Sequence, residues 1–290
     1  MQWVEPRRAW KPRQDSIHLK QCVRAGKAGS LAVVNRGAAA VGDVLDVARR
    51  VRTGDIGGWE REWQRTADLA LTRGDQLLGG DVLDRGDVLD GGDDLDGGDD
   101  LDGACRAFLR AAEYYRQAGI FSDGESRRAL DMSHVNAFRA AMPLLPVAAE
   151  IVEITDAASG DSGSHRLRGY LFRVAAGTGR PLVLATVGAD STAEAGYPLV
   201  AMPVIERGMN CLILDCSSDR PTRHSATACW RRALPAAARW IAERSDLDGA
   251  PLVLLPGSDP FGDELAGVAK AEPFTAGPTP LELGDVQPGA

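Results

Sequence analysis

The sequence lacks the features of an exported or membrane-bound protein. No apolar stretch approaches the roughly 18 residues that span a bilayer, and the N-terminal segment MQWVEPRRAWKPRQ contains no apolar signal core. The five cysteines are scattered, with no CxxC pair and no histidine at zinc-ligand spacing. These absences predict a cytoplasmic protein with reduced thiols, no membrane partner and no metal or other cofactor.

An excess of positive charge is also missing. The net charge is −8, and residues 74–103, with eleven aspartates and one arginine, account for −10 of it. The rest of the chain therefore sums to about +2, which leaves no basic surface typical of a nucleic-acid partner. The length of 290 residues, with 44% hydrophobic and 26% charged residues, is typical of one or two globular domains.

Helical spacing of apolar residues dominates the first half of the sequence. Residues 1–41 form a basic, flexible N-terminus, and residues 42–146 are predicted to form a helical domain. Helices are expected over residues 44–51, 59–70, 104–118 and 125–142. The pair Gly57-Gly58 separates the first two, and Trp59 and Trp63 make an apolar ridge that we interpret as helix–helix core.

A tandem repeat of six residues interrupts this domain. The units GDQLLG, GDVLDR, GDVLDG, GDDLDG and GDDLDG follow one another over residues 74–103. Closely spaced carboxylates suit calcium, but known glycine–aspartate calcium solenoids repeat every nine residues. One leucine per unit buries little apolar area, so we predict a disordered acidic insertion, with a calcium site as the alternative.

Strand patterns follow in residues 147–272. Apolar and polar residues alternate over 149–155 and 165–174, which predicts an antiparallel hairpin. Three apolar runs, at 181–187, 210–215 and 251–255, are typical of buried parallel strands, and helical patterns at 193–207 and 226–244 separate them. Residues 273–290, rich in proline and glycine, are expected to form a flexible tail.

Two junctions after these strands contain residues suited to chemistry. At Thr186–Gly196 a glycine turn precedes a helix start, so the backbone N–H groups of Gly188 and Ala189 are placed to face an anion or an oxyanion. A tight turn without a ligand explains the same pattern. At Leu254–Leu265 a serine follows a strand, but the G-x-S-x-G pattern of a nucleophile elbow is interrupted.

The order of these segments resembles the α/β-hydrolase superfamily. The stretches that carry the likeness are FLRAAEYYRQA, RGYLFR, GADSTAEAGYPLVAMPVIERGMNCLILD and the strand that leads to the serine turn. They are similar to the branch of fermentation–respiration-switch-type esterases and dihydroxypseudooxynicotine-hydrolase-like enzymes, over about residues 42–272. The resemblance implies an α/β fold: an incomplete, truncated α/β-hydrolase-like parallel sheet preceded by a helical N-terminal domain.

The resemblance also implies a catalytic serine. Counting forward along the strand 251–255 places it at Ser258, whereas counting back from the following helix places it at Pro260, which has no hydroxyl. Gly188 and Ala189 would then be the oxyanion donors. The implied substrate is a small-molecule ester, or a ketone cleaved at the neighbouring carbon–carbon bond.

A histidine is missing where the superfamily order of serine, acid and histidine requires one. None of the 32 residues after Ser258 is a histidine, and the four in the chain are His18, His134, His165 and His224. His224, after the second parallel strand, is the alternative base. Because a serine without an imidazole is a weak nucleophile, we expect weak or absent activity.

Two other functions compete with an impaired serine hydrolase. The first is a non-catalytic, hydrolase-derived interaction module, and the second is a calcium-dependent binder that acts through the acidic repeat. The sheet is also expected to end at the apolar strand 251–255. An exposed edge of this kind predicts a homo-oligomer or aggregation.

Overall fold

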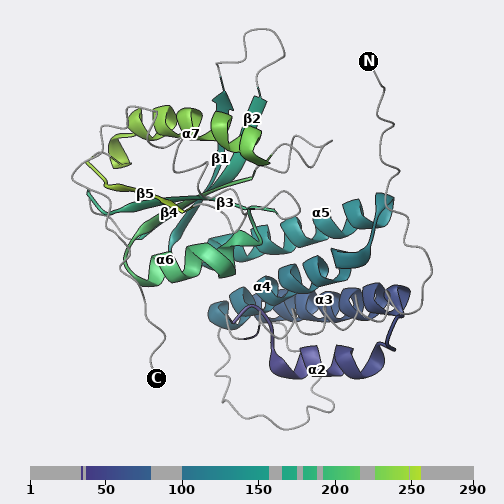
Figure 1. Ribbon diagram of the computed structural model, residues 1–290. Helices are drawn as coiled ribbons and strands as arrows, with labels where there is room; N and C mark the ends of the chain where they lie inside the picture. The colour runs from purple at the N-terminus through teal and green to yellow at the C-terminus, as the bar shows by residue number, and fades with distance from the viewer. Residues whose placement is uncertain are drawn as a thin grey trace, which may run out of the picture. The chain divides into compact units, whose positions relative to one another are not determined.

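The computed structural model describes residues 34, 37–79, 100–156, 165–174, 179–187, 192–215, 226–247 and 249–255, and of 156, 165 and 226–233 only the backbone. The chain divides into two compact units, Met1–Leu144 and Leu145–Ala290. The described part of the first unit is helical, and that of the second is built on one sheet (Figure 1).

The helical unit contains the four predicted helices. They are α2 (Val41–Arg50), α3 (Ile56–Gly79), α4 (Leu101–Ala118) and α5 (Gly124–Ala141). Two 3-10 turns, η1 (Gly119–Phe121) and η2 (Met142–Leu144), follow α4 and α5. Gly119 ends α4 as predicted, but with φ −74° it adopts a right-handed conformation and starts the 3-10 turn.

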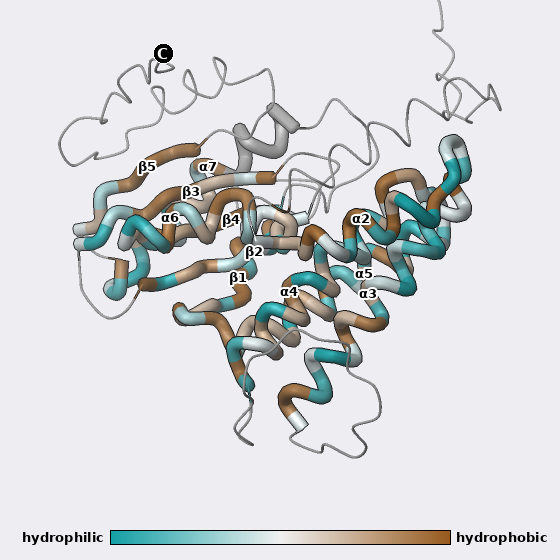
Figure 2. Tube along the Cα trace, turned by 90° about the horizontal axis from the view of Figure 1, so that it is seen from below, coloured by the Kyte–Doolittle hydropathy of each residue, from teal (hydrophilic) through white to brown (hydrophobic). Residues whose placement is uncertain are grey.

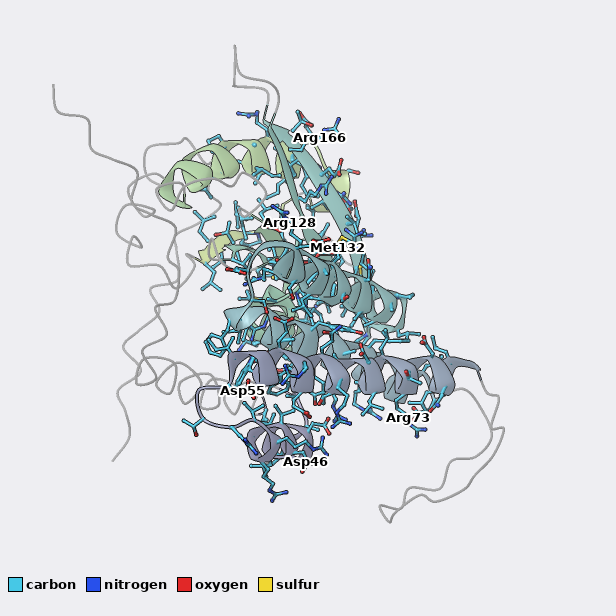
Figure 3. The ribbon with its side chains drawn as sticks, turned by 90° about the vertical axis from the view of Figure 1, so that its right-hand side faces the viewer. Asp46, Asp55, Arg73, Arg128, Met132 and Arg166 are labelled. Carbon is cyan, nitrogen blue, oxygen red and sulfur yellow. The ribbon has the colours of Figure 1, made fainter. Side chains whose placement is uncertain are left out.

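The boundaries of α3 and α4 correct two predictions. Gly57 and Gly58 lie inside the first turn of α3, because the Asp55 carboxylate accepts a hydrogen bond from the Gly58 N–H (2.7 Å) and so caps the helix. At the other boundary, Asp100 caps α4 by accepting from the Gly103 N–H (2.6 Å). Figure 3 labels Asp55 at the start of α3 and Arg73 towards its other end.

The acidic repeat is therefore helical at both of its ends. Its first unit, residues 74–79, completes α3, and its last residues begin α4. Gly74 is buried there because its backbone lies against the Phe108 ring, where a Cβ atom would come within 2.5 Å of Cε1. Predicted disorder over residues 74–103 is thus wrong at the two ends, and residues 80–99 lie outside the described part.

Aromatic side chains form the core of the helical unit, as predicted. The Trp59 and Trp63 rings are 5.7 Å apart, and Trp63 is 5.4 Å from the Tyr114 ring on α4. The fully buried aromatic side chains of this unit are Trp59, Trp63, Phe108, Tyr114 and Phe138. The Trp59 indole N–H donates to the Gln117 carbonyl oxygen (2.7 Å), so the ridge also joins α3 to α4 by a hydrogen bond.

One mixed sheet organises the second unit. Its strands are β1 (Ala148–Asp156), β2 (His165–Arg173), β3 (Leu182–Thr186), β4 (Asn210–Asp215) and β5 (Leu252–Leu255). Their order is β1-β2-β4-β3-β5, with β1 and β2 antiparallel to their neighbours and β3, β4 and β5 parallel. The hairpin and the parallel strands are confirmed, but the sheet is mixed, because β2 pairs antiparallel with β4.

Helical segments lie on both faces of this sheet. A π-helical turn, η3 (Tyr197–Ala201), runs into α6 (Met202–Glu206) after β3, and α7 (Ala226–Ala242) with the 3-10 turn η4 (Ser245–Leu247) follows β4. Leu184 of β3 and Leu212 of β4 belong to one core cluster with Leu234 of α7. The parallel strands accordingly show as apolar segments in Figure 2.

Gly169, in the middle of β2, allows the close approach of β4. It lies opposite Leu214, and a Cβ atom at this position would collide with the carbonyl oxygen of Ile213. Glycine inside a strand commonly marks such an approach. Antiparallel pairing of β2 with β4, which joins the hairpin to the parallel strands, therefore depends on this residue.

Candidate active site

The carboxyl ends of β3 and β5 define the place where a ligand is expected. From β3 the chain crosses to β4 on one side, and from β4 it crosses back to β5 on the other side of β3. In open α/β sheets, ligands bind beyond the carboxyl ends of the strands at such a reversal of strand order. The pairing of Ala185 with Leu255 brings these two strand ends side by side.

The candidate residues of the sequence analysis flank these strand ends. Gly188 and Ala189 come directly after Thr186 and Val187, and Ser258 comes three residues after Leu255. All three lie outside the described residues, so their roles stay predictions. The described part of the sheet brings together the strand ends that lead into them.

Thr186, the last residue of β3, carries a hydroxyl that has no partner in the described part of the chain. The residue is 4% exposed, and its Oγ1 atom has no hydrogen-bond partner among the described residues. A buried hydroxyl without a partner costs free energy, and such groups often mark functional sites. The sequence analysis assigned no role to this residue, because burial and pairing cannot be inferred from a threonine at a strand end.

A buried tyrosine–glutamate pair joins β2 to the segment that follows β3. The Tyr170 hydroxyl of β2 donates to Glu194 Oε1 at 2.6 Å, and Glu194 is 7% exposed. Glu194 precedes η3 in the segment that follows β3. Tyr170 lies in the alternating stretch RGYLFR, but nothing in the sequence linked it to a residue 24 positions away.

The described histidines do not supply an evident base. His134 is buried in the helical unit, where its Nδ1 lies 2.8 Å from the carbonyl oxygen of Ala112, as expected of a core residue. His165 begins β2, near the labelled Arg166 in Figure 3. Strands β4 and β3 separate β2 from β5, and three strand spacings amount to roughly 14 Å. His18 and His224 lie outside the described residues.

The described residues show neither a metal cluster nor a membrane-spanning helix. None of them gather into a cluster of three or more histidine, cysteine, aspartate or glutamate side chains suited to a metal ion. Among the same residues, no helix combines the length and apolar character needed to cross a membrane. Cys105 and Cys211 are free and buried, and burial raises the pKa of the Cys211 thiol to about 12.

Comparison with known proteins gives a likeness in fold. No protein-family model and no curated protein matches the chain. The crystal structure of the 2,6-dihydroxy-pseudo-oxynicotine hydrolase matches with a TM-score of 0.58 and 18% identity, over 83% of this chain and 61% of that hydrolase. A second structure, AbyA5, matches with a TM-score of 0.40 and 16% identity, over 68% of this chain and 47% of the AbyA5 chain.

The first match identifies the class of fold. The chain shares an α/β fold with that hydrolase, and this class of fold agrees with the strands and helices predicted from the sequence. It spans about three fifths of the length of the hydrolase it matches. At 18% identity the likeness extends to the fold alone.

Proposed function

We propose that this chain is a serine hydrolase of the dihydroxypseudooxynicotine-hydrolase-like branch with weak or absent turnover. Ser258 is the nucleophile, and the N–H groups of Gly188 and Ala189 stabilise the oxyanion. The substrate class is a small-molecule ester or a ketone cleaved at the adjacent carbon–carbon bond. We assign no residue of the given sequence to the triad acid or to the triad histidine.

The main support for this proposal is the pairing of β3 with β5. Nucleophilic attack on a carbonyl requires the hydroxyl and the oxyanion donors on either side of one reacting atom. The segments that hold Gly188 and Ser258 start from neighbouring strand ends at the reversal of strand order. The likeness to a hydrolase fold gives independent support.

The positions of the described histidines support weak turnover. A general base must come within hydrogen-bond distance of the serine hydroxyl. Among the described histidines, His134 belongs to a helical core and His165 starts a strand about 14 Å from β5. Loss of a triad histidine costs several orders of magnitude in rate.

A fluorophosphonate probe tests this assignment. We expect slow labelling of the full chain at Ser258, found by peptide mass spectrometry and abolished in Ser258→Ala. The control is Ser245→Ala, in η4 at the far end of the sheet, which should label like the unmodified chain. Labelling that persists in Ser258→Ala would show that another residue is the nucleophile.

The exposed edge strand β5 favours a second function. The chain would be an interaction module that pairs with a second copy of itself. Among the described strands β5 pairs only with β3, and its Val253 and Leu255 are 41% and 37% exposed. The strand carries no charge, so two copies would meet without repulsion. The opposite edge, β1, carries Glu150 and Glu153, which discourage pairing.

Light scattering coupled to sizing chromatography tests this second function. Val253→Lys should shift the chain from dimer or larger species to monomer. Ile151→Lys is the matched control, because Ile151 is 48% exposed on the other edge strand and should leave the association unchanged. A monomer at high concentration before any substitution would exclude the second function.

A further inference from the structure

We infer that Tyr170 and Glu194 are positioning residues for the oxyanion donors. Their hydrogen bond holds residues 192–197, which follow the donors in the chain, against β2. The inference rests on the proposed function, which assigns Gly188 and Ala189 as the donors. Neither residue of the pair is proposed to touch the substrate.

Burial gives the first reason to assign a role to this pair. A buried carboxylate costs several kcal/mol unless it is hydrogen-bonded. The Tyr170 hydroxyl meets that need at 2.6 Å, on a side of β2 that also carries the buried Phe172 ring, 6.2 Å from the Tyr170 ring. Because apolar residues of the same volume often stabilise such a site equally well, stability alone does not explain a polar pair here.

Two further contacts fix the same segment. The Tyr197 ring packs against Phe172 of β2 at 5.2 Å between centroids. Gly196 lies so close to its neighbours that a Cβ atom would come within 2.9 Å of Val187 Cγ1 and 3.1 Å of Ile213 Cδ1. The segment therefore contacts β2, β4 and the residue directly after β3.

Local hydrogen bonds make this segment a compact turn. The N–H groups of Ala195, Gly196 and Tyr197 donate to the carbonyl oxygens three residues earlier, at 3.0 to 3.1 Å. The π-helical turn η3 follows at once, and π-helical turns frequently occur at functional sites. The hydrogen bond of Glu194 thus fixes the start of this compact turn relative to β2.

Three variants and one matched control test the inference. Tyr170→Phe and Glu194→Ala remove the hydrogen bond, whereas Glu194→Gln keeps an oxygen that accepts from Tyr170. The control, Tyr115→Phe, removes a tyrosine–carboxylate bond of the same length, 2.6 Å to Asp68, from the helical unit. Two readouts are measured: amide hydrogen exchange of residues 192–197 and the rate of fluorophosphonate labelling at Ser258.

The expected result is local and depends on the hydrogen bond. Tyr170→Phe and Glu194→Ala should each speed exchange of residues 192–197 and slow labelling by about tenfold, the usual effect of one such bond. Glu194→Gln and Tyr115→Phe should leave both rates within about threefold of the unmodified chain. If Glu194→Gln keeps both rates near those of the unmodified chain, the effect of Glu194→Ala comes from the lost hydrogen bond and not from a general loss of packing.

Opposite results overturn the inference. Exchange of residues 192–197 that is unchanged in Tyr170→Phe, or equally fast in Tyr115→Phe, excludes a positioning role. Equal damage by Glu194→Gln and Glu194→Ala excludes the hydrogen bond as its cause. If the unmodified chain is not labelled at all, the proposed function fails, and the exchange rates still decide whether the pair positions the segment.

Discussion

In the helical unit, two hydrogen bonds of aromatic side chains join neighbouring helices, whereas in the sheet unit two buried polar side chains lie at and just after the end of a strand. Tyr115 donates to Asp68 on α3, and Trp59 donates to the backbone of α4. In the sheet unit, Thr186 ends β3 and Glu194 begins the next segment. The hydrogen bonds of the helical unit stabilise a scaffold. The polar side chains of the sheet unit lie near the strand end where a ligand is expected.

The cores of the two units also differ in their side chains. Large aromatic rings fill the helical unit, whereas leucine and isoleucine fill most of the sheet unit. Aromatic cores concentrate stability in a few residues, because each ring buries a large area. The following variants test this comparison.

Trp63→Ala should have the largest effect. The side chain is fully buried between Trp59 and Tyr114, so its removal leaves a cavity and should lower the free energy of unfolding by about 3–5 kcal/mol. Urea denaturation measures this, with hydrogen exchange reporting which unit opens. A loss smaller than that of Leu184→Ala in the sheet core would contradict the comparison.

Gly74→Ala should destabilise the helical unit by about 1–3 kcal/mol, since its new methyl group would meet the buried Phe108 ring. Gly79→Ala, at the last residue of the same helix, is the matched control. No atom lies within 4 Å of a Cβ there, so this variant should be neutral or slightly stabilising. Equal stabilities of the two variants in urea would show that Gly74 is not a packing position.

Thr186→Val should act in the opposite direction to Tyr115→Phe. Valine removes a buried hydroxyl that is unpaired among the described residues and keeps the shape, so stability should be unchanged or rise by about 1 kcal/mol, whereas Tyr115→Phe should lower it by about 1 kcal/mol. Thermal unfolding of both variants provides the measurement. A clear destabilisation by Thr186→Val would mean that the hydroxyl has a structural partner.

Asp246→Asn should have the smallest effect, present at neutral pH and lost in acid. Hydrogen bonds from the Arg244 guanidinium lower the pKa of Asp246, so this carboxylate stabilises the fold above its unfolded pKa of about 4 and loses that effect as pH falls through the lower folded pKa. The variant should flatten the loss of stability between neutral and acidic pH. An unchanged profile in acid denaturation would exclude a contribution from this pair.

Short-range patterns predicted most of the elements but not how they pair. Alternation identified β1 and β2, and apolar runs identified β3, β4 and β5, because burial of side chains follows the strand period. The pairing of β2 with β4 depends on the space left by Gly169, which no local pattern reveals. The start of α3 was misjudged because the Asp55 cap outweighs the cost of two glycines in its first turn.

The candidate site shows the same limit. Motifs pointed to Gly188, Ala189 and Ser258, and topology brings together the strands that precede them. Tyr170 and Glu194 lie in stretches that carry the resemblance, but neither they nor Thr186 were assigned a role, because their importance depends on burial and on contacts between residues far apart in sequence.

The most direct test is the site and rate of fluorophosphonate labelling of the full chain. The account predicts a single labelled residue, Ser258, with a rate far below that of a serine hydrolase with a complete triad. Labelling as fast as that of a complete hydrolase would contradict the weak turnover, and no labelling after prolonged incubation would contradict the nucleophile.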